Sequence, residues 1–164
     1  MKTLLQIMTE KLESKQVVYL MVGIPGSGKS TWCKNTHPDL PVVSRDSIRA
    51  ELGYTKDSNE KAVLTREQEN QVTNAEYKKI IDLATDGKDF IIDDTNTGIY
   101  RKNMIDKLRK LNLKIIGVNL KTPLSTCIER RKGQIPEYIM HKLYAKKIDL
   151  KPGEVDEIIN VEGE

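Results

Sequence analysis

The chain has 164 residues, of which 38% are hydrophobic and 31% are charged, and its formal net charge is +3. This length suits one compact domain, and the composition is ordinary for a soluble protein. A dedicated nucleic-acid binder without enzymatic activity is often more basic, so the charge permits nucleic-acid binding without requiring it. No apolar run reaches the length of about 18 residues that a membrane-spanning helix needs, and we expect no membrane partner.

Residues 1–15 are the first predicted element, either an amphipathic helix or a flexible extension of the domain. We expect such a helix to pack on the domain or on a neighbouring subunit through one apolar side. That side would carry Leu4, Leu5, Met8 and Leu12. The apolar stretch is too short and too interrupted for a signal peptide.

The two cysteines, Cys33 and Cys127, lie far apart in the sequence and lack the spacing of metal ligands. Two free thiols are typical of a protein in a reducing compartment. We therefore expect a cytoplasmic location.

Short runs rich in β-branched residues predict the strands of a sheet. They are 17–22, 41–44, 90–92, 115–120 and 157–161. The first and fourth runs are continuously apolar, which is typical of strands buried on both faces. Helical stretches fall between the runs. This alternation predicts an α/β fold with a parallel sheet of about five strands, helices on both faces and right-handed crossovers.

The first two predicted helices follow the first two strands, at 29–35 and 45–52. Thr65 and Gln68 have the form of a capping box, which predicts a helix running to about Thr85. The apolar positions of this third helix are Ala75, Ile80, Ile81 and Ala84.

Thr97 is a candidate cap for a fourth helix, in which apolar residues recur at spacings of three and four. These residues are Tyr100, Met104, Ile105, Leu108 and Leu111. The region 124–147 is helical in pattern but is interrupted at 133–136 by glycine and proline. We expect all these elements to form a single domain over residues 1–164.

A glycine-rich segment joins the first strand to the first helix after it. Residues 23–30 read Gly-Ile-Pro-Gly-Ser-Gly-Lys-Ser and fit the P-loop pattern G-x-x-x-x-G-K-[ST] at every required position. Such a loop points its backbone N–H groups at phosphates, and the following helix adds its partial positive charge. The candidate nucleotide-binding residues are Gly23, Pro25, Gly26, Ser27, Gly28, Lys29, Ser30 and Thr31.

The P-loop predicts ATP and Mg²⁺ as cofactors. Lys29 would place its ammonium at the β- and γ-phosphates, and Ser30 would offer its hydroxyl to Mg²⁺. The motif does not identify the acceptor, because GTPases, motor ATPases and small-molecule kinases share it.

Asp46 and Arg49 follow the second strand and are the candidate residues for the acceptor. Ligands of open α/β sheets bind beyond the carboxyl ends of the strands, so this segment should face the same crevice as the P-loop. At a helical spacing of three, the two side chains share a face. Asp46 would take the proton of an acceptor hydroxyl, and Arg49 would hold an anionic group of the acceptor. The other interpretation is an ordinary acidic helix start with a surface arginine.

Asp93 and Asp94 end the third strand in the manner of a Walker B element, in which an aspartate helps to hold Mg²⁺. Asp94 is the candidate metal ligand together with Ser30. It could equally orient Arg49 or the acceptor, and the division of roles between Asp93 and Asp94 stays open.

Arg130 and Arg131 follow the fourth strand, just before the glycine and proline of 133–136. Arginines stabilise the charge that develops during phosphoryl transfer. A basic helix end of this kind predicts a small helical lid, at about 124–147, that closes over ATP. A solvated helix end whose cations complement the helix dipole is the other interpretation.

Together these segments resemble the kinase domain of bacteriophage polynucleotide kinase and its bacterial end-healing relatives. The family's P-loop, G-x-P-G-S-G-K-S-T, matches residues 23–31, and its R-D-x-x-R segment matches 45–49. D-T-N follows at 94–96, and then come a lid with arginines and a proline-led helix at 136–147. The resemblance covers about 17–161.

The resemblance implies a P-loop kinase-type fold and transfer of the γ-phosphate of ATP to the 5′-OH end of RNA or DNA. It implies that Asp46 is the general base, that Arg49 binds the phosphate 3′ to the attacked nucleotide and that Asp94 supports the site. Either Arg130 or Arg131 would act from the lid. Relatives often self-associate, so a homo-oligomer is compatible with the resemblance.

The sequence departs from the family in two respects. The family usually spaces its lid arginines several residues apart, whereas Arg130 and Arg131 are adjacent. Many relatives carry a phosphatase or ligase domain on the same chain, and no D-x-D-G-T segment occurs here.

Two other functions remain open at this point. A P-loop kinase for a small molecule is one, because adenylylsulfate kinases also use an aspartate and an arginine three apart after the second strand. Gluconate, antibiotic and zeta-toxin-like kinases have the same architecture. The other is a nucleotide-gated module that hydrolyses ATP slowly, although such a switch does not need the Asp46–Arg49 pair. The sequence does not distinguish an RNA acceptor from a DNA acceptor, because no aromatic-rich segment on which bases would stack is evident.

Overall fold

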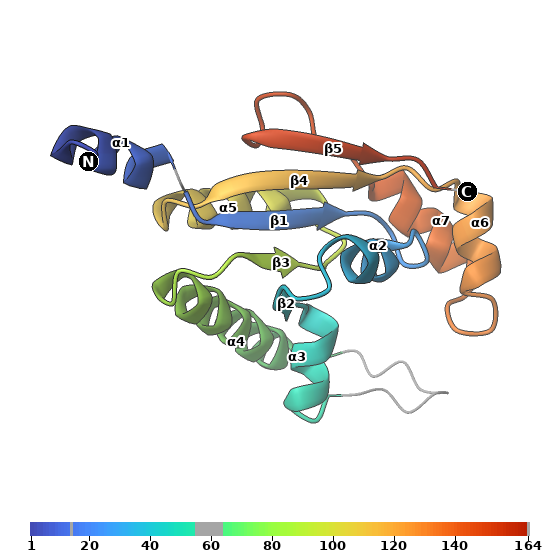
Figure 1. Ribbon diagram of the computed structural model, residues 1–164. Helices are drawn as coiled ribbons and strands as arrows, with labels where there is room; N and C mark the ends of the chain where they lie inside the picture. Colours follow the sequence, from blue (N-terminus) through green and yellow to red (C-terminus); the bar gives the residue numbers. More distant parts are fainter. Residues whose placement is uncertain (14, 55–63, 164) are drawn as a thin grey trace.

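A computed structural model describes residues 1–13, 15–54 and 64–163 of the chain. Its centre is a five-stranded sheet in the order β2-β3-β1-β4-β5, in which every neighbouring pair is parallel (Figure 1). The strands are β1 (Val17–Val22), β2 (Val42–Val43), β3 (Phe90–Ile92), β4 (Lys114–Leu120) and β5 (Glu157–Val161). The predicted parallel α/β sheet is confirmed. The predicted single domain also includes residues 14, 55–63 and 164, which lie outside the described residues.

The helices of the described residues follow the predicted alternation. They are α1 (Leu4–Glu13), α2 (Lys29–Thr36), α3 (Arg45–Glu51), α4 (Arg66–Thr85), α5 (Gly98–Lys110), α6 (Leu124–Arg130) and α7 (Glu137–Lys146). The helical region 124–147 is interrupted near 133–136 as the glycine and proline predict.

Helices cover both faces of the sheet because the central strands are buried on both sides. Leu20 and Phe90 face a core that contains Ile48 of α3, Val72 of α4 and Leu108 of α5. On the opposite face, a second core packs strand residues against α2. Its members are Met21, Cys33, Ile91, Val118 and Leu120. The continuously apolar runs therefore mark strands with two buried faces, as expected.

Helix α4, the third of the helices predicted after the first strand, begins at the predicted capping box. The Thr65 hydroxyl accepts the N–H of Gln68 at 3.1 Å, and the Gln68 side chain accepts the N–H of Thr65 at 2.9 Å. The predicted apolar positions are only partly right, because Ile81 is 44% exposed. The buried stripe of α4 consists of Val72, Glu76 and Ile80, spaced at four residues, and Ile81 is turned by about 100° from it.

Helix α5 differs from its predicted pattern at its first turn. Tyr100, predicted to be apolar core, is 81% exposed. The buried stripe instead starts at Arg101 and continues through Met104 and Leu108. Arg101 tolerates burial because its Nε donates to Glu154 at 2.7 Å. Thr97 occupies the cap position without a side-chain cap hydrogen bond.

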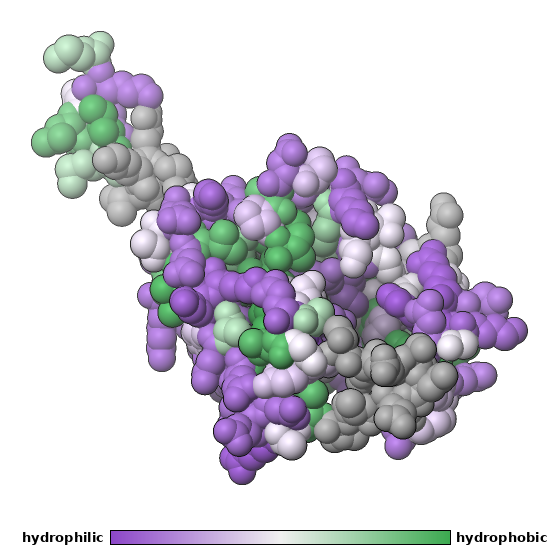
Figure 2. Space-filling view, turned by 90° about the horizontal axis from the view of Figure 1, so that it is seen from below, coloured by the Kyte–Doolittle hydropathy of each residue, from purple (hydrophilic) through white to green (hydrophobic). Residues whose placement is uncertain are grey.

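Helix α1 stands off the body of the molecule (Figures 1 and 2). Leu4, Leu5 and Met8 of its predicted apolar side are exposed, so the expected packing on the domain is not seen for these residues. The side chain of Leu12 lies outside the described residues. Within the described chain, no helix combines the length and the apolar character needed to cross a membrane.

Candidate active site

The P-loop has the backbone geometry that phosphate binding requires. Gly26 and Gly28 adopt positive φ angles of 81° and 94°, which favour glycine. A Cβ on Gly26 would lie 2.9 Å from the carbonyl oxygen of Cys127, so the close approach of α6 also demands glycine. Helix α2 begins at Lys29, directly after the loop, and the free N–H groups of its first turn favour an anion there.

The Lys29 ammonium is held at the loop by two carbonyl oxygens. It donates to Gly23 at 2.9 Å and to Ile24 at 3.1 Å. Burial lowers the pKa of Lys29, while the carboxylate of Asp93 opposes this effect and the guanidinium of Arg131 reinforces it. A half-buried cation of this kind interacts strongly with phosphate, because little water screens it.

The remaining P-loop residues border the same space. Pro25 lines a cleft of about 1030 Å³ together with Lys29 and Ser30. A second cleft, of about 670 Å³, is lined by Thr31 and by Gly26 to Ser30. Ser27 is buried, and its carbonyl accepts the hydroxyl of Thr122 at 2.6 Å. These contacts bring together the predicted nucleotide-binding residues.

Ser30 pairs with the first of the two aspartates after β3. Its hydroxyl donates to an Asp93 carboxylate oxygen at 2.9 Å. A hydroxyl beside a carboxylate is the set of hard oxygen ligands that fits Mg²⁺, which also takes water and nucleotide phosphates. The predicted partner of Ser30 was Asp94, for which no such contact is present, and its role as a ligand stays a prediction.

Asp94 and Glu76 of α4 form a buried carboxyl pair. Asp94 accepts the backbone N–H of Arg45 at 2.9 Å and lies beside Glu76. Burial and the neighbouring Glu76 together raise the pKa of Asp94 to about 8. Glu76 is only 2% exposed. The pair therefore favours a proton on Asp94 at neutral pH.

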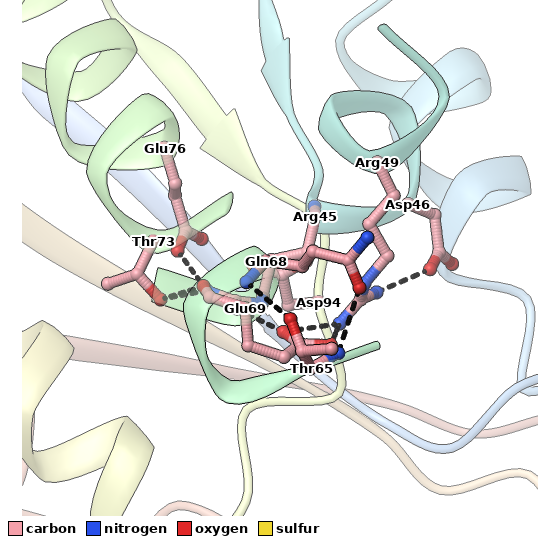
Figure 3. Close-up of polar contacts among 9 residues, drawn as sticks. All are labelled: Arg45, Asp46, Arg49, Thr65, Gln68, Glu69, Thr73, Glu76 and Asp94. Carbon is pink, nitrogen blue, oxygen red and sulfur yellow. Dashed lines mark hydrogen bonds and ion pairs between the residues drawn. The ribbon is translucent and has the colours of Figure 1, made fainter. Parts of the chain in front are cut away.

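Arg45 links this carboxyl pair to the acceptor residues (Figure 3). Its guanidinium donates to Glu76 at 2.9 Å, to Thr73 at 3.1 Å and to Glu69 at 2.9 Å. Burial lowers the pKa of Arg45, but the hydrogen bonds to Glu69 and Glu76 and the charges of these carboxylates raise it overall. Glu69 also lies 3.4 Å from the Arg49 guanidinium.

Sequence reasoning missed the contribution of α4 to the site. The available signal was a glutamate within an apolar helical stripe, at position 76 between Val72 and Ile80. A carboxylate at such a position needs a buried partner, which the sequence does not name.

Asp46 and Arg49 lie where the sequence predicts. Arg49 donates to Asp46 at 2.9 Å, and the Asp46 side chain is 94% exposed. Both residues line the 1030 Å³ cleft that also contains Lys29, Asp93 and Arg131. The candidate acceptor pair and the P-loop lysine thus border one cleft.

The two lid arginines have different contacts. Arg130, the last residue of α6, donates to the Gly26 carbonyl at 3.0 Å. Arg131 donates to Gln134 at 3.0 Å and lines both clefts. Both predicted lid residues therefore adjoin the P-loop, and Arg131 also borders the space around Lys29.

Residues 18–138, well over half of the chain, match the model of the AAA_33 family, described as an AAA domain. The chain belongs to this family. It is 26% identical over 147 residues to a protein of Autographa californica nuclear polyhedrosis virus described as a bifunctional polynucleotide kinase/RNA ligase. That match covers 85% of the chain but 21% of the viral protein, so the chain spans only about a fifth of this relative.

Solved structures share the fold of this family member. A kinase structure from Chloroflexus aurantiacus matches with a TM-score of 0.67 and 13% identity, over 91% of this chain and 89% of that one. A chain of the Pnkp1/Rnl/Hen1 RNA repair complex matches with a TM-score of 0.67 and 21% identity, over 80% of this chain and 44% of that one. A sugar kinase and a gluconokinase are also among the matches. At these identities the likeness establishes a P-loop kinase fold.

The buried carboxyl pair predicts a pH-dependent stability. The folded-state pKa of Asp94, about 8, exceeds the ordinary value of 3.8, so the folded protein holds a proton that the unfolded chain releases between these values. The free energy of unfolding should therefore fall as the pH rises from about 4 to about 8. Asp94→Asn keeps an oxygen for the Arg45 N–H and offers an amide to Glu76, so the fall should be smaller.

Urea unfolding of the unsubstituted protein and of Asp94→Asn from pH 5 to pH 9, in buffer with a chelator, measures this difference. Asp106→Asn, which removes an exposed carboxylate of α5, should behave as the unsubstituted protein. An equal fall in stability for all three proteins would contradict the proton-sharing pair.

Proposed function

We propose that the protein transfers the γ-phosphate of ATP to the 5′-OH end of RNA or DNA. The observation that carries the proposal is the position of the Asp46–Arg49 pair, which lines the same cleft as Lys29 of the P-loop. A phosphate-binding loop alone supports nucleotide binding. A carboxylate and a guanidinium beside it supply what an acceptor hydroxyl with a neighbouring phosphate needs.

The donor side is built around the P-loop. Its backbone N–H groups and Lys29 would hold the β- and γ-phosphates, and Arg131 would stabilise charge on the transferred group. Ser30 and Asp93, whose side chains are hydrogen-bonded, would hold Mg²⁺, which would neutralise charge on the phosphate oxygens. Asp94, the ligand that the sequence favours, directly follows Asp93.

On the acceptor side, Asp46 would accept the proton of the 5′-hydroxyl. The hydroxyl oxygen then forms a bond to the γ-phosphorus, the bond from this phosphorus to the β–γ bridging oxygen breaks, and ADP leaves. Arg49 would hold the phosphate 3′ to the attacked nucleotide. The half-buried Arg45 and its partners Glu69 and Glu76 would fix the start of α3 and so position Asp46.

The likeness to a viral protein described as a polynucleotide kinase/RNA ligase supports a nucleic-acid acceptor. We further propose that residues 1–164 form one kinase domain that acts on 5′-OH ends in the cytoplasm. A small-molecule acceptor is the second candidate, because sugar kinases share the fold and an aspartate base serves either acceptor.

An acceptor panel with radiolabelled ATP and Mg²⁺ tests the proposal. We expect label on 5′-OH oligonucleotides and none on oligonucleotides that already carry a 5′-phosphate. Lys29→Ala should abolish the transfer while its circular dichroism stays unchanged, because among the described residues only Lys29 donates an ammonium to the P-loop carbonyls. A panel in which sugars or other metabolites are labelled and oligonucleotides are not would refute a polynucleotide acceptor.

Asp46 and Arg49 should fail in different ways when substituted. Asp46→Asn keeps the shape and removes the base, so turnover should fall by roughly 10²-fold or more with ATP affinity nearly unchanged. Arg49→Ala should weaken the preference for a nucleoside 3′-phosphate over a bare nucleoside, by roughly 10- to 150-fold. Steady-state kinetics on both acceptors measure these effects. An Arg49→Ala enzyme with the full preference would show that Arg49 does not contact the acceptor phosphate.

Substitutions of Arg130 and Arg131 should also have different kinetic effects. Arg131→Ala should reduce kcat by about 10²-fold, because Arg131 lines the cleft around Lys29 and can stabilise the transferred group. Arg130→Ala should have a smaller effect on kcat and act mainly on ATP affinity, since Arg130 bonds the P-loop carbonyl of Gly26. Turnover and ATP titrations on both variants decide the question, and equal losses of kcat would contradict this division.

A further inference from the structure

The large cleft does not end at the acceptor pair. From Asp46 and Arg49 it continues along α4 and α5, where Tyr77, Tyr100 and Lys107 line it. Its volume of about 1030 Å³ slightly exceeds the range of roughly 300–1,000 Å³ that is usual for ligand pockets. The cleft therefore has room for more than a phosphoryl group and one nucleoside.

One face of α5 borders this extension. Tyr100, Asn103 and Lys107 lie at helical spacings of three and four and all line the cleft. Tyr100 lies in the first turn of α5 and is 81% exposed, although the next residue, Arg101, is buried. An exposed ring at the edge of a polar cleft is available to stack on a planar group.

Lys107 supplies a positive charge to the same face. Its ammonium lies 3.6 Å from the centre of the Tyr77 ring, a cation–π contact that holds it in place. No ion pair joins Lys107 to another described residue, whereas Arg45 is paired with both Glu69 and Glu76. Lys107 is therefore the cation of this part of the cleft that remains available to an anionic ligand.

We propose that this face of α5 binds the second nucleotide of the acceptor strand. Lys107 would hold the phosphate 3′ to that nucleotide, and Tyr100 would stack on its base. The inference rests on the proposed function, because it extends the strand from the phosphate assigned to Arg49. The chemistry required is a planar base joined to a second phosphate, which a single nucleotide or a sugar lacks.

The test compares two acceptors, a nucleoside 3′-phosphate and a dinucleotide with a 3′-phosphate. The second acceptor adds one base and one phosphate, and the unsubstituted enzyme should use it with a higher kcat/KM. In Lys107→Met the gain from the second nucleotide should shrink by roughly 10-fold or more, while kcat/KM for the shorter acceptor stays unchanged. Lys102→Met is the matched control, because Lys102 is exposed on α5 outside the cleft lining and should leave the gain intact.

Tyr100 gives an independent measurement. Tyr100→Ala should reduce the gain by roughly 5-fold or more, and Tyr100→Phe should retain it, because the ring and not the hydroxyl stacks on the base. An equal gain in the unsubstituted enzyme and Lys107→Met would overturn the subsite, as would no gain in the unsubstituted enzyme. Equal losses in Lys107→Met and Lys102→Met would also overturn it, because they would indicate general charge attraction.

A binding measurement separates this inference from the proposed function. If the unsubstituted enzyme phosphorylates no oligonucleotide, the proposed function fails. The affinity for a 5′-OH trinucleotide with a 3′ fluorophore, measured by anisotropy, then decides the subsite. A weaker affinity in Lys107→Met than in Lys102→Met supports it, and equal affinities overturn it.

Discussion

The ion pairs of Arg45 fix the geometry on which the acceptor side depends. Arg45 begins α3, its guanidinium bonds Glu69 and Glu76 of α4, and its backbone N–H bonds Asp94 after β3. One residue thus joins three segments that are distant in the sequence. A buried charge that loses its partner is strongly destabilising, so this arrangement is held as a unit. The next residue is Asp46, and a base can act only where its backbone is fixed relative to the P-loop.

Asp93 and Asp94 show how one strand end produces two chemical environments. Asp93 accepts a hydrogen bond from the Ser30 hydroxyl at the mouth of the P-loop. Asp94 turns to the α4 side, where burial and Glu76 raise its pKa to about 8. Successive residues at a strand end point to opposite sides, and this alternation separates the two carboxyl groups. Burial beside Glu76 of α4 favours a proton on Asp94, while Asp93 lies on the P-loop side.

Local patterns predicted those parts of the site that local chemistry determines. The P-loop at 23–30 needs glycines and a helix start, and both are visible in neighbouring residues. The partners of Arg45 were not predictable, because Glu76 is adjacent to it only after α4 packs on the sheet. The same limit explains the error at Tyr100. The apolar ring of a tyrosine predicts a core position from the local pattern. The burial of Arg101 in its place depends on Glu154, which lies 53 residues later in the chain.

The packing of α6 against the P-loop brings two adjacent arginines to the loop. Ile24 packs with Cys127 in a small core, and a Cβ on Gly26 would lie 2.9 Å from the Cys127 carbonyl oxygen. Helix α6 therefore packs directly on the P-loop, and no longer segment is needed to bring its arginines to the loop. Successive side chains at a helix end diverge by about 100°. Arg130 consequently bonds the loop, while Arg131 turns toward the cleft.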